Sequence, residues 1–259
     1  MNDNLTFWQH LDVLRGSMIR CLVAVTVCAV AAFCLKDSLF HFILWPEKAD
    51  FPLYRMLESV TGNHSPLTIT SIPLISTGLA QQFIVHMRVA LAVGALIVSP
   101  YILYELFRFV SPGLYPNERK AGLPALVAGW GMFLLGVALT YLVLFPFTFR
   151  FLGTYQVQSG VENLITLDSY VSTLLIMSLM MGVLFELPVL CWLLAKLGLL
   201  SAAPMRTYRK HAFVLILILA AVITPTGDIF TLSLVSLPIY VLYEASIGVV
   251  KHVERQKIT

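Results

Sequence analysis

The chain has 259 residues, of which 58% are hydrophobic and only 12% are Asp, Glu, Lys or Arg, and its net charge is +3. A soluble domain usually carries about 25% charged residues. With a mean hydropathy of +0.84, this composition excludes a soluble enzyme, a disordered chain and a nucleic-acid-binding protein. It predicts an all-α polytopic protein embedded in a lipid bilayer.

Six apolar stretches are candidates for membrane-spanning helices, because about 20 residues cross the roughly 30 Å hydrocarbon core. They cover residues 18–35, 83–105, 122–146, 169–195, 211–224 and 229–249. Residues 36–82, which separate the first two, form too long a segment for a hairpin turn and predict a structured outer loop. No repeat or second linker is visible, so residues 1–259 are expected to form a single membrane domain.

The distribution of basic residues predicts the orientation. If the N-terminus is cytoplasmic, the inner segments hold most of the Lys and Arg, and the outer segments hold only Lys36, Lys48, Arg55 and Arg150. Both termini are therefore expected on the cytoplasmic side of the membrane.

The last two stretches are short. Residues 211–224 would give a helix of only about 21 Å, and the run from Ile229 is little longer before it meets Glu244. Short helices must draw polar groups inward, oligomerise or thin the bilayer. A hairpin of two short helices favours local thinning of the bilayer.

Glu186 is the most informative polar residue, because it lies inside the fourth stretch. A charge at mid-helix is costly and an intramembrane carboxylate is a functional hypothesis by default. Pro188 cannot donate a backbone hydrogen bond to Leu184 and predicts a kink there. The alternative is a protonated glutamate that bonds to the freed carbonyl. Glu105 and Glu244, near the inner ends of their stretches, are interpreted as structural, within reach of water or a neighbouring arginine.

No catalytic or cofactor motif is present, and the six histidines show no metal-ligand spacing. The sequence therefore predicts neither an enzyme nor a metal or cofactor site. Any directed transport would therefore have to be driven by a partner protein or by the transmembrane potential. A proton-coupled secondary transporter using Glu186 is the rival interpretation, although transporters usually contain repeated halves.

The segment between the second and third stretches is compact. Pro112, Gly113 and Pro116 favour a short, stiff inner loop that presents Glu118 beside Arg119 to the cytoplasm. Taken alone, such a glutamate is more often a solvated charge than a ligand site.

Several motifs occur together from His10 to Glu244, and with them the chain closely resembles the TatC family, the core membrane subunit of the twin-arginine protein translocase. The motifs are His10-Leu11-x-x-Leu14-Arg15, Pro100-x-x-x-Tyr104, Phe109-x-x-Pro112-x-Leu114-Tyr115-x-x-Glu118-Arg119, Phe145-Pro146, Phe185-Glu186-x-Pro188, Thr224-Pro225 with Asp228, and Pro238-x-Tyr240.

The resemblance implies a receptor in the inner (cytoplasmic) membrane that binds twin-arginine signal peptides of folded precursors. It also implies a concave, glove-like arrangement of six helices, TatA- and TatB-type single-span partners, an oligomeric complex and transport driven by the proton-motive force. The signal-peptide site maps onto His10, Asp12, Arg15, Tyr115, Glu118 and Arg119. Glu118 would receive the arginine pair. Glu186, Pro188 and Asp228 map onto partner or pore contacts.

Two positions depart from the family pattern. The family usually has a glutamate where this chain has Val13, and many members have a glutamine where it has Leu232. Two explanations for the first departure remain open. Either Glu118 works nearly alone, or the helix is rotated or frayed so that Asp12 reaches the arginines.

Overall fold

The computed structural model describes residues 7–48, 50–61, 73–110, 122–156, 158, 163–224 and 227–258. Most of these residues are helical, and five helical segments are long and apolar enough to cross a membrane. The elements in chain order are α1 (Phe7–Phe33), α2 (Lys36–Ile43), η1 (Trp45–Glu47), α3 (Pro52–Thr61), β1 (Leu74–Ile75), α4 (Gln81–Val110), α6 (Gly122–Leu139), η3 (Thr140–Leu144), α7 (Phe145–Thr154), β2 (Ile165–Thr166), α8 (Leu167–Phe185), α9 (Leu187–Lys196), α10 (Ala202–Thr207), α11 (Arg209–Ile223) and α12 (Ile229–Ile258).

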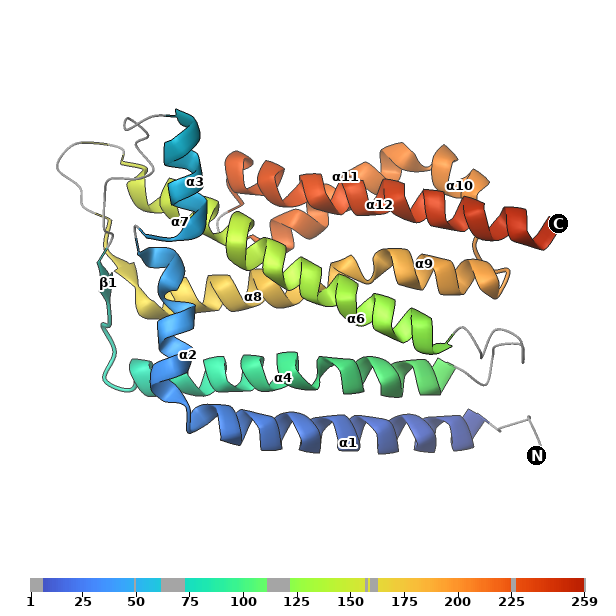
Figure 1. Cartoon of the computed structure of the whole chain (residues 1–259), viewed down its shortest axis with the longest axis horizontal. Coiled ribbons are helices and arrows are strands. Elements are labelled where there is room, and N and C mark those ends of the chain that lie inside the picture. Colours follow the sequence, from blue (N-terminus) through green and yellow to red (C-terminus); the bar gives the residue numbers. More distant parts are fainter. Residues whose placement is uncertain are drawn as a thin grey trace.

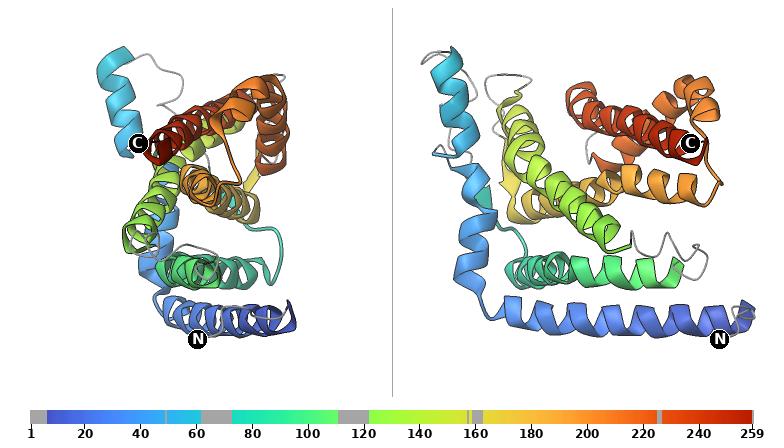
Figure 2. Two further views of the ribbon diagram at one scale, coloured as in Figure 1. Left: turned by 90° about the vertical axis from the view of Figure 1, so that its right-hand side faces the viewer. Right: turned by 45° about the vertical axis from the view of Figure 1, so that its right-hand side comes forward.

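The long helices lie roughly side by side, and α6 crosses them obliquely (Figure 1). Helices α1 and α4 form one edge of the molecule in every view, whereas α11 and α12 lie beyond α8 and α9 on the other side (Figure 2). The start of α1 and the end of α12 lie at the same end of the molecule. We call this the inner end, and the opposite end, which carries α2 and β1, the outer end.

The outer loop predicted for residues 36–82 is structured in its described parts. It contains α2, η1, α3 and the short strand β1, which pairs in parallel with β2. Three tyrosine hydroxyls donate hydrogen bonds between this loop and the helices: Tyr141 to the carbonyl of Phe42, Tyr170 to that of Ile43, and Tyr54 of the loop to that of Pro146 in α7. These bonds fix the loop to the helices below it.

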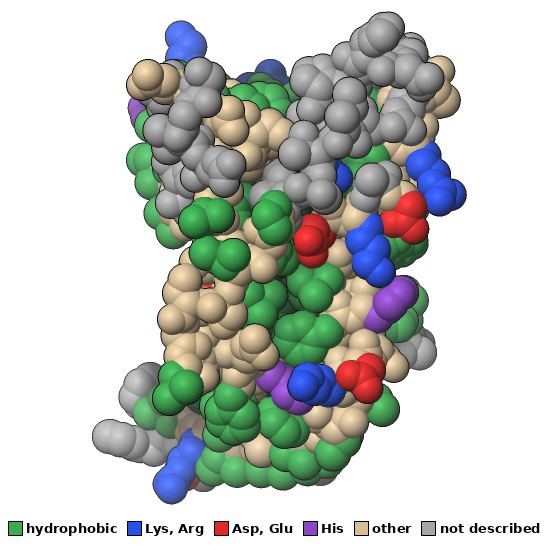
Figure 3. Space-filling model, turned by 90° about the vertical axis from the view of Figure 1, so that its left-hand side faces the viewer, with side chains coloured by type: hydrophobic (Ala, Val, Ile, Leu, Met, Phe, Trp, Pro, Cys, Tyr) green, Lys and Arg blue, Asp and Glu red, His purple; other side chains and the backbone are tan. Residues whose placement is uncertain are grey.

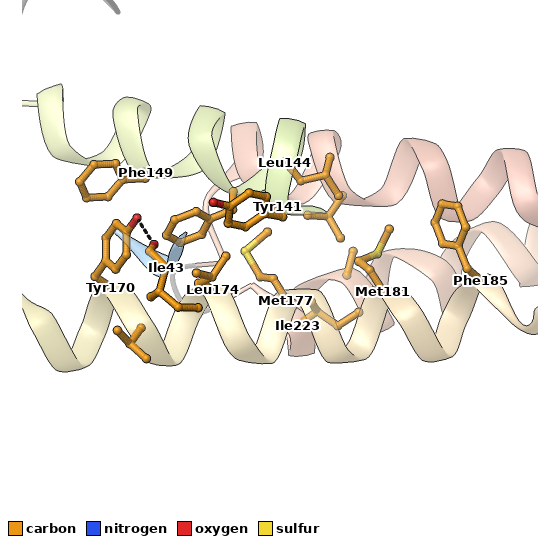
Figure 4. Packing of buried hydrophobic residues seen from close by; sticks show 14 of the residues in the cluster. Ile43, Tyr141, Leu144, Phe149, Tyr170, Leu174, Met177, Met181, Phe185 and Ile223 are labelled. Carbon is orange, nitrogen blue, oxygen red and sulfur yellow. Dashed lines mark hydrogen bonds between the residues drawn. The ribbon is translucent and has the colours of Figure 1, made fainter. Parts of the chain in front are cut away.

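The main hydrophobic core lies under this loop, between α4, η3, α7, α8, α11 and α12. Figure 4 shows Leu174, Met177 and Met181 on one side of α8, pointing toward the helix that carries Tyr141. Helices α6 and α8 approach closely at Gly136, where an added Cβ would lie 2.7 Å from the Met181 carbonyl oxygen. Only glycine fits this crossing without a shift of the backbone.

Several helices differ in length from the sequence-based expectations. The third continues through the π-helical turn η3 to Thr154, with Pro146 directly after that turn. The prediction of a short sixth helix is wrong: α12 has 30 residues and passes through Glu244 to Ile258. Glu244 does not end the helix because Arg209 and Tyr240 bond to its carboxylate. The fifth is short as predicted, with 15 residues in α11.

Candidate functional site

Only part of the expected peptide-binding surface can be placed. Tyr115, Glu118 and Arg119 lie outside the described residues. His10 belongs to the first turns of α1, and Asp12 and Arg15 are exposed on the same helix. The structure thus locates the α1 half of the predicted surface.

Val13, the position that departs from the family pattern, is 44% exposed. In an α-helix, residues four and seven positions apart share a face. Val13 therefore lies on the same face as Ser17 and Arg20, whereas Asp12 points about 100° away. Because α1 is continuous from Phe7, the described backbone gives no sign of the fraying that would bring Asp12 onto that face.

Ser17 and Arg20 contact the carboxylate of Glu105 on α4, which is only 3% exposed. One oxygen, Oε1, accepts hydrogen bonds from Arg20 Nε at 3.0 Å and Tyr101 Oη at 2.8 Å. The other, Oε2, accepts from Arg20 Nη2 and Ser17 Oγ, both at 2.8 Å. Each oxygen thus has two donors, and the bidentate guanidinium contact is the strongest geometry available to such a pair.

This network sets the register between α1 and α4, which run in opposite directions (Figure 1). Glu105 lies five residues before Val110, the last residue of α4, so the start of α1 lies near that end of the helix. A second close contact supports the pairing, because an added Cβ at Gly94 would lie 2.7 Å from the backbone nitrogen of Ala29. The start of α1 is therefore held beside the point where the inner loop begins.

The structural role expected for Glu105 is confirmed by this geometry. A neighbouring arginine was expected without its position, and Ser17 was not expected. The spacing of three between Ser17 and Arg20, on the face of α1 that carries Val13, was the signal that could have indicated a shared contact.

Glu186 lies where α8 gives way to α9. Its own N–H bonds to the carbonyl of Val183, three residues back, and α9 starts at Leu187. Pro188, in the first turn of α9, has no N–H to continue the ladder, so the predicted kink is confirmed as a break.

The side chain of Glu186 is buried, with 9% of its surface exposed, and its Oε1 has no hydrogen-bond partner among the described residues. The carboxylate lies against Gly129 of α6, where an added Cβ would be 2.9 Å from Oε2. No hydrogen bond from the Glu186 side chain to the Leu184 carbonyl is recorded among the described residues. The alternative of a protonated glutamate bonded to that carbonyl is therefore not supported.

Glu186 opens onto a cavity of about 140 Å³ between α4, α6 and α9. It is the only charged residue in the lining, which otherwise consists of Leu103, Leu106, Phe107, Ala125, Leu126, Gly129, Val189, Leu190, Trp192 and Leu193. A carboxylate in such surroundings is expensive unless it is protonated or meets a polar partner.

Asp228, expected at a partner or pore contact, caps a helix. Its Oδ1 accepts a hydrogen bond from the N–H of Thr231 at 2.8 Å, the arrangement of an N-cap residue at the start of α12. This contact gives Asp228 a role within the chain.

Three further charged contacts stabilise the helices. Arg88 pairs with Asp168 and Ser172 near the outer end, and Arg209 pairs with Glu244 near the inner end. Arg150, counted in the sequence as an outer charge, is instead buried, with its guanidinium 4.5 Å from the ring centroid of Tyr54. No pattern in the sequence pointed to this contact.

Within the described ranges, His, Cys, Asp and Glu form no group of three or more that could hold a metal ion. The candidate site is therefore a binding surface at the inner end of α1 together with an isolated buried carboxylate at the α8–α9 break.

Comparison with known proteins relates the chain to a family. A sequence model described as Sec-independent protein translocase protein (TatC) matches residues 9–238. Sec-independent protein translocase protein TatC of Blattabacterium sp. subsp. Periplaneta americana is 31% identical over 98% of this chain and 98% of its own length. The TatC protein of Helicobacter pylori is 40% identical over 94% of this chain and 87% of its own length.

A solved structure agrees with the sequence matches. The crystal structure of the twin-arginine translocase receptor TatC superimposes with a TM-score of 0.76 at 27% identity, covering 95% of this chain and 99% of that one.

Proposed function

The chain belongs to the TatC family of Sec-independent protein translocase proteins, and we propose that it is the receptor subunit that binds twin-arginine signal peptides at the cytoplasmic face. As a family member it is a multi-pass membrane component of protein transport, not a member of a catalytic enzyme family. The family does not favour the rival interpretation, a proton-coupled transporter.

The observation that carries the proposal is the register of α1 against α4. The Arg20–Glu105 contact holds the start of α1, with Asp12 and Arg15, beside the end of α4. The inner loop with Tyr115, Glu118 and Arg119 follows α4 directly in sequence. The two segments assigned to the peptide thus begin at the same end of the molecule.

Glu118 is the principal acceptor of the arginine pair in this proposal. A guanidinium binds a carboxylate bidentately, and a charge-assisted bond contributes roughly 1.5–3 kcal/mol. Lysine offers only a point charge and would fit less well. His10 belongs to the same surface.

The experiment is peptide binding to the purified full chain. Glu118→Ala and Glu118→Gln should both abolish binding of a twin-arginine peptide, because the guanidinium groups require the negative charge. Asp37→Asn, at an exposed carboxylate of the outer loop, is the matched control, and a twin-lysine peptide is the matched ligand. Unchanged affinity in both Glu118 variants would reject the assignment.

Orientation is a separate part of the proposal, with both termini cytoplasmic and six crossings of the inner membrane. Single cysteines at Asn63 or Gln158, in a chain lacking its own four cysteines, should react with an impermeant reagent added from outside. Cysteines at Asn117 or Ser201 should not. Reversed labelling would overturn the orientation and the cytoplasmic receptor site with it.

Glu186 and Pro188 are assigned to a later step, in which TatA- or TatB-type partners join the receptor to nucleate an oligomeric complex driven by the proton-motive force. The buried Oε1 of Glu186, which has no partner among the described residues, supports this assignment, since a polar group on a partner helix would satisfy it. Glu186→Ala should preserve peptide binding and impair co-purification of single-span partners or export.

A further inference from the structure

A second cavity lies at the outer end, away from the residues assigned to the signal peptide and to partner helices. It measures about 380 Å³ and is lined by Lys36, Phe40, Gln82, Phe83, His86 and Leu167. These residues come from the first turns of α2, α4 and α8 and from the middle of α2. Figure 3 views the molecule from this end and shows basic, acidic and histidine side chains close to apolar ones.

His86 is the unexplained group in this cavity. It is only 7% exposed, and its Nε2 has no hydrogen-bond partner among the described residues. The ring is held in place by stacking on Phe33, with centroids 4.0 Å apart and planes 12° apart, and by an edge contact with Phe40. A buried polar nitrogen without a partner costs free energy, so a ligand that supplies one would bind favourably.

The electrostatics of the cavity favour an anion. Lys36 supplies a positive charge and Gln82 an amide that can donate hydrogen bonds. Helix α2 begins at Lys36, a residue of the lining, and has no side-chain cap, so the positive end of its dipole lies at the edge of the cavity. Asp37 is the nearest acidic residue in sequence but is not part of the lining, and Asp168 is neutralised by Arg88.

The level of the cavity indicates which anion. Phe83 in its lining is 58% exposed, and just inward on the same helix Met87 and Leu91 are also exposed apolar residues. Helix α4 is a candidate membrane span that starts at Gln81, so Phe83 lies near the outer boundary of the hydrocarbon and Met87 and Leu91 lie within it. The cavity therefore lies where the phosphates of the outer leaflet lie.

We propose that this cavity, which we call the outer phosphate pocket, binds the phosphodiester of an anionic phospholipid of the outer leaflet. Lys36 and the start of α2 attract the charge, the Nε2–H of His86 and the amide of Gln82 donate to phosphate oxygens, and Phe40, Phe83 and Leu167 contact the glycerol and upper acyl carbons. The apolar half of the lining distinguishes a lipid from free phosphate, which would leave it unfilled.

The test is native mass spectrometry of the full chain in detergent with phosphatidylglycerol added. We expect phosphatidylglycerol to be retained about tenfold better than diacylglycerol, which lacks the phosphate, the factor given by one charge-assisted bond. Lys36→Gln and His86→Phe should each remove that preference. His86→Phe keeps the ring stack, and Lys36→Gln changes an exposed side chain that the fold does not need.

Lys48→Gln is the matched control, since Lys48 is an exposed lysine of the same outer loop that does not line the pocket. An unchanged preference in Lys36→Gln would overturn the proposal, as would an equal loss in Lys48→Gln. Displacement of phosphatidylglycerol by excess inorganic phosphate would overturn the lipid assignment and leave a site for the free ion.

Discussion

Two buried glutamates, Glu105 and Glu186, lie in neighbouring helices of the same membrane domain and have opposite surroundings. Glu105 accepts four hydrogen bonds, from Ser17, Arg20 and Tyr101. Glu186 faces an apolar cavity with one oxygen unpartnered among the described residues. Both were visible in the sequence as carboxylates within apolar stretches.

The difference teaches that the position of a carboxylate in a span does not decide its role. Glu105 is matched by a fixed cation, and the pair joins two helices. Glu186 is matched by nothing that the described chain supplies, and Gly129 leaves it room to move. The first glutamate should therefore be needed for folding and the second for an event that brings in another group.

The largest expected effect comes from removing the cation beside Glu105. Arg20→Met leaves a buried carboxylate with only two hydroxyl donors and should lower the free energy of unfolding more than the other substitutions. Denaturant titration in detergent measures it. The double variant Arg20→Met/Glu105→Gln should recover most of the loss, because no unpaired charge remains.

Arg209→Met is the matched control for this experiment. It breaks the more exposed ion pair with Glu244 and should cost no more than about 1 kcal/mol. Equal losses in the two arginine variants would show that burial of the carboxylate does not govern the cost.

Two glycines of α6 sharpen the comparison further. Gly136→Ala places a Cβ against the Met181 carbonyl and the Phe185 ring, both fixed, and should destabilise the chain by about 2 kcal/mol. Gly129→Ala places it against the end of the Glu186 side chain, which can rotate away, and should cost less. Thermal unfolding of both variants measures the difference, and an equal cost would mean that the Glu186 carboxylate is rigidly held.

Glu186→Gln should change the free energy of unfolding by less than about 1 kcal/mol, because no ion pair is lost. Glu105→Gln, its matched counterpart, loses charge-assisted bonds and should cost more. Comparing the unfolding midpoints of the two variants tests the assignment of one carboxylate to folding. A larger loss for Glu186→Gln would reverse the roles.

Glu47 is a third carboxylate, outside the spans, and its substitution should have the smallest effect on stability. Burial raises the pKa of its carboxyl above the usual value, only partly opposed by the charges of Lys48 and Arg150. The ionised form is therefore disfavoured in the folded chain, and this destabilisation appears as pH rises through the carboxyl range. Glu47→Gln should be more stable than the wild type by about 0.5 kcal/mol or less at pH 7, and the difference should vanish near pH 3. An unchanged difference at both pH values would contradict this explanation.

The helices and the buried carboxylates could be predicted from the sequence, because apolar runs and an interrupting Glu-x-Pro are local signals. The partners of those carboxylates could not. Ser17 and Glu105 are far apart in the chain, and only the register of two helices brings them together. Glu244 misled the prediction of α12 for the same reason: a charge that would end an isolated apolar run is tolerated once Arg209 reaches it from another helix.

The π-helical turn at Thr140–Leu144 sets the rotational phase of everything that follows it in the third long helix. A π-turn accommodates one residue more than an α-helical turn, so removing a single residue there would rotate α7 by about 100° about its axis. Arg150 would then swing out of its place beside Tyr54 and away from the carbonyl of Glu47, to which its Nη2 donates. The packing of the outer loop on the helices thus depends on this π-helical turn. Deleting one apolar residue there would disrupt the Arg150 contacts two turns away.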